Sequence, residues 1–276
     1  MVPILPFDII ENIVGILIDD VKGLQYVKAL SLTCPSFLPC CRKHIFSCIE
    51  IKIDSTRPST QYPTAEAFER LLLDTPPIAK CVRHLTIHIT QHRHSTHSFD
   101  QVGRQLTRLR SLTVSLWHHS RPSANNWNNI PSSMQSSLIN LMHLPTLSNL
   151  YLESIRNFPI FNLITCASLK HLFVKDLDVS YEDEEGPFSL LHKPMQLQSL
   201  DIEISGWQTP GLIAARCADG RPVIDFTCLE KINIYFSFHS GWRDAALPTR
   251  EIFSKAQRLT DISLKGNEIW NLRFTG

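Results

Sequence analysis

The sequence of 276 residues has little glycine and none of the glycine-rich loops that hold nucleotide phosphates. Its ten glycines form neither G-x-x-x-x-G-K-[ST] nor G-x-G-x-x-G, and no G-x-S-x-G surrounds a nucleophilic serine. The 27 basic residues nearly balance 26 acidic ones, and the formal net charge of +1 gives no general attraction to nucleic acid or an acidic membrane. We therefore expect a protein that is not an enzyme, has no cofactor and does not bind nucleic acid.

Long hydrophobic runs are also missing. No run approaches the ~18 apolar residues that a membrane span needs. The first residues, MVPILPFD, lack a basic start, and Asp8 and Glu11 soon interrupt the apolar stretch, so we expect no signal peptide and no membrane contact. The eight cysteines form no C-x-x-C pair and are interpreted as free, buried thiols. These features favour the reducing cytoplasm or nucleus.

Histidine is concentrated in one part of the chain, but not in a pattern that suits a metal. A metal site needs several ligands converging at ~2.0–2.2 Å. His84 and His88 lie on one extended strand, too far apart to share an ion. The polar loop HRHSTHS (92–98) could wrap an ion, but its histidines are interpreted as solvated loop residues and no metal is expected. These are His92, His94 and His97, with His118 and His119 nearby.

The first 48 residues carry apolar side chains at helical spacing. The spacing predicts a helix that starts at Pro6, with Asp8 in its first turn. A second helix is predicted over 24–33 and a third over 39–46. The predicted apolar positions are Ile9, Ile10, Ile13, Ile16 and Leu17 in the first helix and Leu24, Val27 and Leu30 in the second.

A different periodicity begins at residue 48. The segment CIEIKID (48–54) alternates apolar and polar residues, which predicts a half-buried strand. A helix is then predicted over 64–73, with Thr64 as its N-cap.

A short aliphatic pattern, L-x-x-L-x-L, then recurs through the rest of the chain. It occurs at 82–87, 109–114, 147–152, 169–174, 197–202, 229–234 and 259–264. The middle aliphatic residues are Leu85, Leu112, Leu150, Leu172, Leu200, Ile232 and Ile262. This is the core pattern of leucine-rich repeats, without a strict period.

The pattern predicts short parallel strands that bury one face, with returning segments on the convex side. Helices are expected in two of these segments, 131–144 with Ser132 or Ser133 as N-cap and 248–259 with Thr249 as N-cap. The long steps between copies imply inserted loops at 89–108, 117–130, 205–228 and 237–248. The acidic run YEDEEG (181–186) is interpreted as a solvated loop, or else as a contact for a basic partner.

Alternate residues of these strands are predicted to face the concave side of the sheet and to bind a partner protein. Three of them, Tyr151, Phe173 and Tyr235, are expected to be exposed aromatics, which are enriched at binding hot spots. The alternative is that loop residues Trp117, Trp127, Trp207 or Trp242 cover them. The predicted concave positions are Thr86, His88, Thr113, Ser115, Tyr151, Glu153, Phe173, Lys175, Asp201, Glu203, Asn233, Tyr235, Ser263 and Lys265. The eight from Tyr151 to Tyr235 are the candidate substrate-binding residues.

The segments at 5–14 and 29–51 resemble an F-box, especially the fungal kind fused to an irregular leucine-rich-repeat domain. The family pattern opens with Leu-Pro, an acidic residue and paired aliphatics, and continues through a Leu-rich helix, a Cys, an aromatic and a basic segment ending in Phe. The usual Glu is Asp8 here, a mild departure. The matching residues are Leu5, Pro6, Asp8, Ile9, Ile10, Leu30, Leu32, Cys34, Phe37, Arg42, Lys43 and Phe46.

The resemblance implies a partner. F-box helices dock their apolar faces onto a Skp-type adaptor, which links them to a cullin–RING ubiquitin ligase. Three short helices bury little of their own surface, and a partner helix in the exposed groove completes the burial. The residues implied in the adaptor contact or its supporting core are Leu5, Pro6, Ile9, Ile10, Ile13, Leu17, Leu30 and Phe37.

The expected protein is therefore an α/β chain with a three-helix F-box at 1–48 and a leucine-rich-repeat solenoid with a parallel sheet at 49–276. Its expected function is substrate recognition for an SCF-type ubiquitin ligase, with an unknown protein as substrate. The alternative is a scaffold whose first helices cap the solenoid. The two differ in one surface: a cap keeps Ile9, Ile10, Ile13 and Leu17 dry, whereas an F-box leaves an exposed apolar patch of roughly a few hundred Å2.

Overall fold

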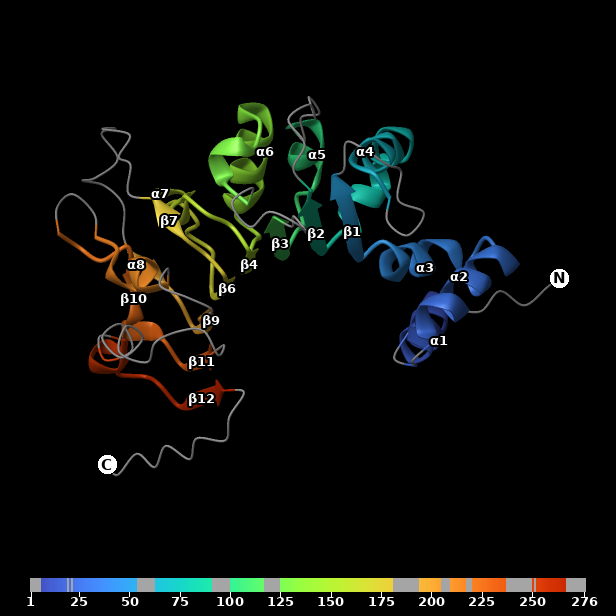
Figure 1. Ribbon diagram of the computed structural model, residues 1–276. Helices are drawn as coiled ribbons and strands as arrows, with labels where there is room; N and C mark the ends of the chain where they lie inside the picture. Colours follow the sequence, from blue (N-terminus) through green and yellow to red (C-terminus); the bar gives the residue numbers. More distant parts are fainter. Residues whose placement is uncertain are drawn as a thin grey trace.

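The chain runs along an arc that starts with helices and continues as a parallel sheet (Figure 1). The computed structural model describes residues 6–18, 20, 22–53, 63–90, 100–116, 125–180, 194–204, 209–216, 220–236, 250 and 252–266. The three helices α1 (Phe7–Ile18), α2 (Gly23–Thr33) and α3 (Leu38–Ile45) lie at one end of the arc, and α3 leads into the first strand.

The helices α2 and α3 start and end within one residue of the predicted bounds, and α1 begins one residue after the predicted start at Pro6. The carbonyl of Pro6 accepts a hydrogen bond from the backbone N–H of Ile10 at 3.2 Å, so Pro6 occupies the N-cap position. Gly23 allows α2 to start against the end of α1, because a Cβ atom there would lie 2.4 Å from the carbonyl oxygen of Ile18.

Eight parallel strands form the main sheet, and they follow one another in chain order. The predicted parallel sheet is therefore confirmed, and every copy of the aliphatic pattern supplies a strand. The strands are β1 (Cys48–Ile53), β2 (His84–Ile89), β3 (Ser111–Leu116), β4 (Asn149–Glu153), β6 (His171–Lys175), β9 (Ser199–Ile204), β11 (Lys231–Phe236) and β12 (Asp261–Gly266). The strand predicted at 48–54 is β1, and it adds an eighth member to the seven copies.

The register brings equivalent residues side by side across the sheet. The middle aliphatics align from Leu85 through Leu112, Leu150, Leu172, Leu200 and Ile232 to Ile262. All are at most 1% exposed except Ile262, which lies on the last strand and is 51% exposed. The pattern therefore sets which side chains enter the core, because a slip of one residue would turn every one of them outward.

Backbone hydrogen bonds fix the start of each strand in the same way. The carbonyl of Arg110 accepts from the N–H groups of Ser148 and Asn149, both at 2.9 Å, and the carbonyl of Ser148 accepts from the next pair at the same distance. The same arrangement recurs at the carbonyls of Ser47, Arg83, Lys170, Gln198 and Glu230. The strands therefore all begin at the same edge of the sheet, although the connections between them differ greatly in length.

The connecting helices lie on the outer side of the arc, and the strands lie on the inner side (Figure 1). The connecting elements are α4 (Ala65–Asp74), η1 (Pro76–Lys80), α5 (Asp100–Gln105), η3 (Trp127–Asn129), α6 (Ser132–Met142), α7 (Phe161–Ile164), α8 (Thr209–Ala214) and η5 (Phe226–Cys228). The connections also contain two short pairs of parallel strands. In one pair β5 (Phe158–Pro159) lies beside β7 (Val179–Ser180), and in the other β8 (Met195–Gln196) lies beside β10 (Ile224–Asp225).

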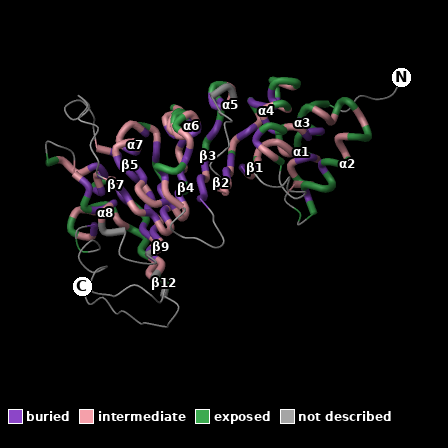
Figure 2. The backbone as a smooth tube through the Cα atoms, turned by 45° about the horizontal axis from the view of Figure 1, so that its top comes forward, coloured by how far each residue is buried: buried purple, intermediate pink, exposed green. Residues whose placement is uncertain are grey.

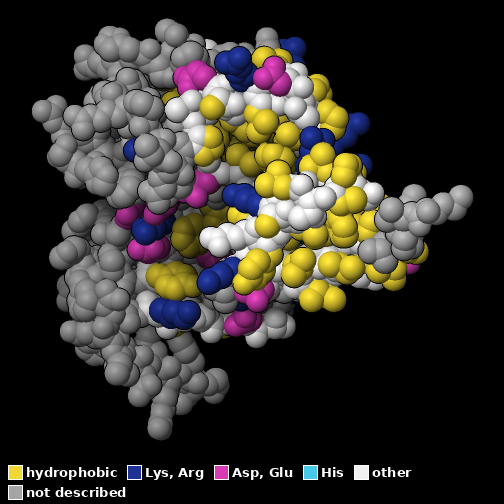
Figure 3. Space-filling model, turned by 90° about the vertical axis from the view of Figure 1, so that its right-hand side faces the viewer, with side chains coloured by type: hydrophobic (Ala, Val, Ile, Leu, Met, Phe, Trp, Pro, Cys, Tyr) yellow, Lys and Arg dark blue, Asp and Glu magenta, His cyan; other side chains and the backbone are white. Residues whose placement is uncertain are grey.

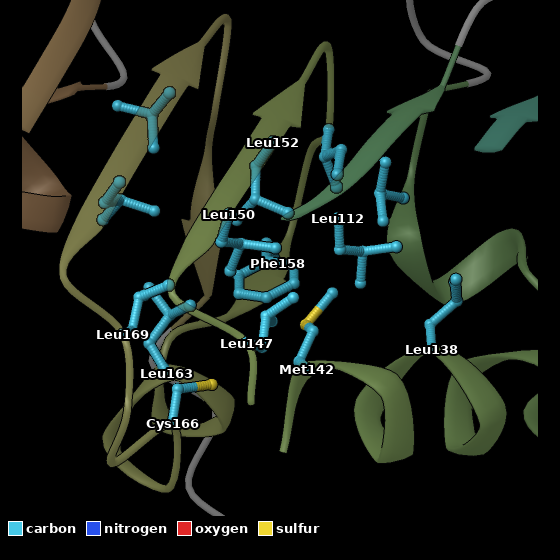
Figure 4. Close-up of a cluster of buried hydrophobic side chains, with 14 of the residues drawn as sticks. Leu112, Leu138, Met142, Leu147, Leu150, Leu152, Phe158, Leu163, Cys166 and Leu169 are labelled. Atoms are coloured by element: carbon cyan, nitrogen blue, oxygen red, sulfur yellow. The ribbon is translucent and has the colours of Figure 1, made fainter. Parts of the chain in front are cut away.

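A continuous hydrophobic core fills the space between the sheet and the outer helices. Near its middle, Leu112, Leu150 and Leu152 from the strands meet Leu138 and Met142 of α6 (Figure 4). The buried residues follow the strands along the arc, whereas the helices α1 to α3 carry mostly exposed and half-buried residues (Figure 2). The two parts therefore differ in how much apolar surface each one buries by itself.

Several local predictions can be compared with these elements. Thr64 is the N-cap of α4 as predicted, since its hydroxyl accepts from the N–H of Ala67 at 3.3 Å. The predicted cap of α6 was wrong: Pro131 precedes the first helical residue, Ser132. A helical turn lies at 252–255, and the predicted cap Thr249 lies outside the described residues.

Candidate functional site

The N-terminal helices form a hydrophobic core of their own. Its buried members are Ile10, Val14, Val27, Cys40 and Cys41. The half-buried residues that pack against it are Leu17, Ile18, Leu30, Phe37 and Ile45. None of these residues belongs to the core of the sheet, which begins with Phe46 and Ile49. The helices therefore pack mainly on one another.

Large apolar side chains remain uncovered on the outside of this helical unit. Ile9, Ile13 and Ile16 lie at i, i+4 and i+7 of α1 and so form one stripe, here called the α1 stripe. Ile16 is 75% exposed and Ile9 42% exposed. Leu32 of α2 is 87% exposed and Leu24 43% exposed. Figure 3 shows hydrophobic side chains gathered on the side of the molecule that carries these helices.

The described residues predicted for an adaptor contact are either exposed, buried or half-buried. Pro6 and Ile9 are exposed, while Ile10 is 3% exposed and belongs to the small core. Leu5 lies outside the described residues. The remaining residues, Ile13, Leu17, Leu30 and Phe37, are half-buried, and all of them except Ile13 pack against the small core. The face of Ile9, Ile10, Ile13 and Leu17, which a helical cap would keep dry and an F-box would leave exposed, is therefore buried at Ile10, half-buried at Ile13 and Leu17, and exposed at Ile9.

An ion pair holds α1 against α3 beside this surface. The Lys43 ammonium lies 2.7 Å from a carboxylate oxygen of Glu11 and 5.5 Å from the centre of the Phe7 ring. The hydrogen bond to Glu11 raises the pKa of Lys43, although partial burial opposes the shift. Phe7 is 52% exposed, so this corner combines an aromatic ring with paired charges.

The cysteines of the helical unit are free thiols. Burial raises the pKa of Cys40 and of Cys41, which keeps both thiols protonated and poorly reactive at neutral pH. Among the described residues no disulfide forms, and no group of three His, Cys, Asp or Glu side chains has metal-binding geometry. His88 instead lies 2.7 Å from Glu50 on the neighbouring strand.

The second candidate surface is the inner face of the sheet. The register aligns Tyr151, Phe173, Asp201 and Asn233 in one row across β4, β6, β9 and β11. A parallel row two residues further on holds Glu153, Lys175, Glu203 and Tyr235. These eight residues, the predicted substrate-binding set, are here called the concave patch.

Two aromatic rings lie together in the concave patch. The rings of Tyr151 and Phe173 have centroids 5.7 Å apart and planes inclined at 37°. Tyr151 is 37% exposed, whereas Phe173 and Tyr235 are half-buried, so the expectation of three exposed aromatics was only partly correct. The alternative that Trp127 covers them was wrong, because this side chain is 1% exposed and packs edge-on against Phe158 in the core. Trp117, Trp207 and Trp242 lie outside the described residues.

A charged triad adjoins the aromatic pair. The Lys175 ammonium lies 3.1 Å from Glu153 and 3.6 Å from Glu203, on the strands to either side. Burial alone would lower the pKa of Lys175, but the hydrogen bond to Glu153 and the charges of both glutamates raise it. One cation is therefore shared by two carboxylates.

Other polar contacts complete the face. The side-chain amide of Asn233 donates a hydrogen bond to the carboxylate of Asp201. The Lys265 ammonium lies 5.3 Å from the centre of the Tyr235 ring. Ser115, which the alternation also placed on this side, is buried at 5% exposure.

One acidic residue of this region was missed in the sequence. Asp176 follows β6 directly and has a left-handed backbone, with φ at 50°. Burial, followed by the charge of Glu203, raises the pKa of its carboxyl group. The strand alternation could not reveal it, because it lies one position beyond the strand where the chain turns.

Comparison with models of known protein families finds no match, and no curated protein sequence matches the chain. Within the described part of the chain, every helix is too short or too polar to cross a membrane. The two candidate surfaces therefore rest on the geometry of this chain alone.

Proposed function

We propose that this chain is a substrate-recognition subunit of an SCF-type cullin–RING ubiquitin ligase. In this proposal α1 to α3 form an F-box that docks a Skp-type adaptor, and the sheet with its outer helices is a leucine-rich-repeat domain that binds a protein substrate. The chain performs no catalysis in this role. It holds a lysine of the substrate near a charged ubiquitin carrier, which raises the effective concentration of the reacting groups.

The observation that carries this proposal is the uncovered apolar surface of the N-terminal helices. Ile16 and Leu32 are 75% and 87% exposed, although both belong to helices with a hydrophobic core beside them. Exposed apolar patches of this kind mark surfaces that bind a partner. A unit of three short helices gains stability when a partner helix covers such a face.

The proposal is tested by co-purification of the chain with a Skp-type adaptor. The test variant replaces two residues of the α1 stripe, Ile9→Ser and Ile16→Ser together. Its matched control is Leu73→Ser with Ile262→Ser, because these residues are also large, apolar and exposed, at 53% and 51%, but belong to α4 and β12. Circular dichroism and thermal unfolding establish that each variant is folded.

The wild type and the control variant are expected to retain the adaptor in a one-to-one complex. The α1-stripe variant is expected to bind at least about tenfold more weakly, since two hot-spot residues are removed. A monodisperse wild-type chain that does not bind the adaptor overturns the proposal and favours the scaffold with a helical cap. Equal losses in both variants would also overturn it, because the α1 stripe would then have no special part.

A further inference from the structure

The chemistry of the concave patch indicates what kind of side chain it accepts. Phe173 lies directly beside Asp201 in the register of β6 and β9, and Tyr151 lies on the other side of Phe173. Neighbouring strands are about 4.8 Å apart. The patch therefore offers an aromatic platform with a carboxylate at its edge.

Among the described side chains around this platform, carboxylates outnumber cations. Among the described residues, Lys175 is the one cation that pairs with Glu153 and Glu203, and Asp201 is paired with the neutral amide of Asn233. Asp176 adds a fourth carboxylate, and Arg156 is the only further cation that acts on it among the described residues. Burial is the main cause that raises the pKa of the Asp176 carboxyl group, and the charges of Glu203 and Glu153 add to it.

The carboxylate of Asp201 is also held in place. The amide of Asn233 donates to one of its oxygens, and an ionised carboxylate has further lone pairs free to accept. A fixed acceptor loses less conformational freedom when a ligand binds. The same face already places one cation over an aromatic ring, since Lys265 lies 5.3 Å from the centre of Tyr235.

We infer that the concave patch binds an arginine side chain of a protein segment. Its guanidinium lies on the rings of Tyr151 and Phe173 and donates from its edge to Asp201 and Glu203. Arginine suits this arrangement better than lysine, because its planar group stacks on an aromatic face and still presents N–H groups sideways to a carboxylate. This inference deepens the proposed function, on which it rests in one respect: the segment would belong to the substrate protein.

The test uses the full chain and defined peptide probes. An immobilised library of X-X-X-Arg-X-X-X heptapeptides, in which X is any residue, is compared with libraries that carry Lys, citrulline or Glu at the centre. The best-bound arginine peptide is then resynthesised with each of these central residues. Dissociation constants are measured by fluorescence anisotropy, at about 50 mM and at about 300 mM NaCl.

The arginine peptide is expected to bind about tenfold or more tightly than its citrulline form, and the difference is expected to shrink at high salt. Phe173→Ala and Asp201→Asn are each expected to weaken binding about fivefold or more. Glu50→Gln is the matched control, since it removes an acid on the same face at β1, and it is expected to change binding by less than about twofold.

Equal binding of the arginine and citrulline peptides overturns the inference, and so does selection of apolar or acidic centres or of no peptide at all. Asp201→Asn is first checked by thermal unfolding, and Glu203→Gln serves as the second acidic variant if Asp201→Asn is destabilised. Adaptor capture is measured separately. A chain that binds the adaptor but selects no arginine defeats this inference alone, and a chain that selects arginine but ignores the adaptor defeats the proposed function alone.

Discussion

The N-terminal helices and the sheet use the same kinds of apolar residue with opposite results. In the sheet, almost every aliphatic residue of the repeated pattern is buried, and the core is continuous from β1 to β11. In the helices, five residues form the buried hydrophobic core, while Ile16 and Leu32 are 75% and 87% exposed. From β1 to β11 the sheet can complete its core within the chain, because each of these strands has neighbours and an outer connection that covers it. The helical unit is too small to do so.

The largest effect is expected from a cavity in the sheet core. Leu150→Ala removes a side chain that is fully buried between β3, β6 and α6, and should lower the free energy of unfolding by about 2–5 kcal/mol. Urea unfolding followed by circular dichroism measures this loss. Leu32→Ala is the control and should stay within about 0.5 kcal/mol, because its side chain is already in water. Similar losses in both variants would break the comparison.

A smaller and more local effect is expected in the helical core. Val27→Ala removes two methyl groups at the centre of the small core, at about 0.8 kcal/mol each. Backbone amides of α1 to α3 should then exchange with solvent roughly tenfold faster, whereas those of β3, β4 and β6 should not change. Hydrogen exchange read by mass spectrometry resolves the two parts. Faster exchange throughout the chain would mean that the parts unfold together.

The strands of the sheet and their buried side could be predicted from the sequence, because both follow from local spacing. Residues two apart in an extended chain share a face, so the aliphatic pattern at 82–87 and its later copies defined both the strands and their buried side. Local chemistry also predicted the N-cap Thr64, because its partner Ala67 lies only three residues away. Elements such as β5 and β10 were not predicted, since two residues carry no periodicity.

The pairs within the concave patch could not be predicted in the same way. The alternation predicts that Tyr151, Phe173 and Lys175 share the inner face, but not which of them meet. Their contacts depend on the lateral register of strands that connections of different length separate. For the same reason Trp127 could be expected in a covering loop, although it packs in the core against Phe158. Long-range packing decides these positions, and the local pattern does not contain it.

In the sheet, the stability of the protein is expected to depend on pH through Asp176, which follows β6. Burial and the charge of Glu203 raise the pKa of Asp176 above its ordinary value of 3.8, so its ionised form is less favourable in the folded chain than in the unfolded one. The protonated carboxyl group of Asp176 therefore favours the folded chain. Its contribution to the free energy of unfolding is fully present below pH 3.8 and is lost as the pH rises through the raised pKa. Asp176→Asn should therefore stabilise the protein at neutral pH, by up to about 1 kcal/mol, and give no gain at low pH.

Asparagine is a suitable replacement because it tolerates the left-handed backbone of this position, with φ at 50°. Thermal unfolding from pH 3 to pH 8 measures the difference between the two proteins. A gain that is equal at all pH values would assign it to the backbone and not to the charge. A loss at neutral pH would mean that Arg156 and Lys175 outweigh the desolvation of the carboxyl group.

The smallest effect is expected at the ion pair that joins α1 to α3. The partners Glu11 and Lys43 are 2.7 Å apart, but their side chains are 48% and 52% exposed, so water and salt weaken the attraction. A double-mutant cycle with Glu11→Gln and Lys43→Met should give a coupling of about 0.5 kcal/mol, which decreases in high salt. The cycle is read from amide exchange in α1 and α3, because the pair acts only within the helical unit. A coupling that also slows exchange in the sheet would show that the helices transmit stability to it, and the contrast between a self-sufficient sheet and an incomplete helical unit would no longer hold.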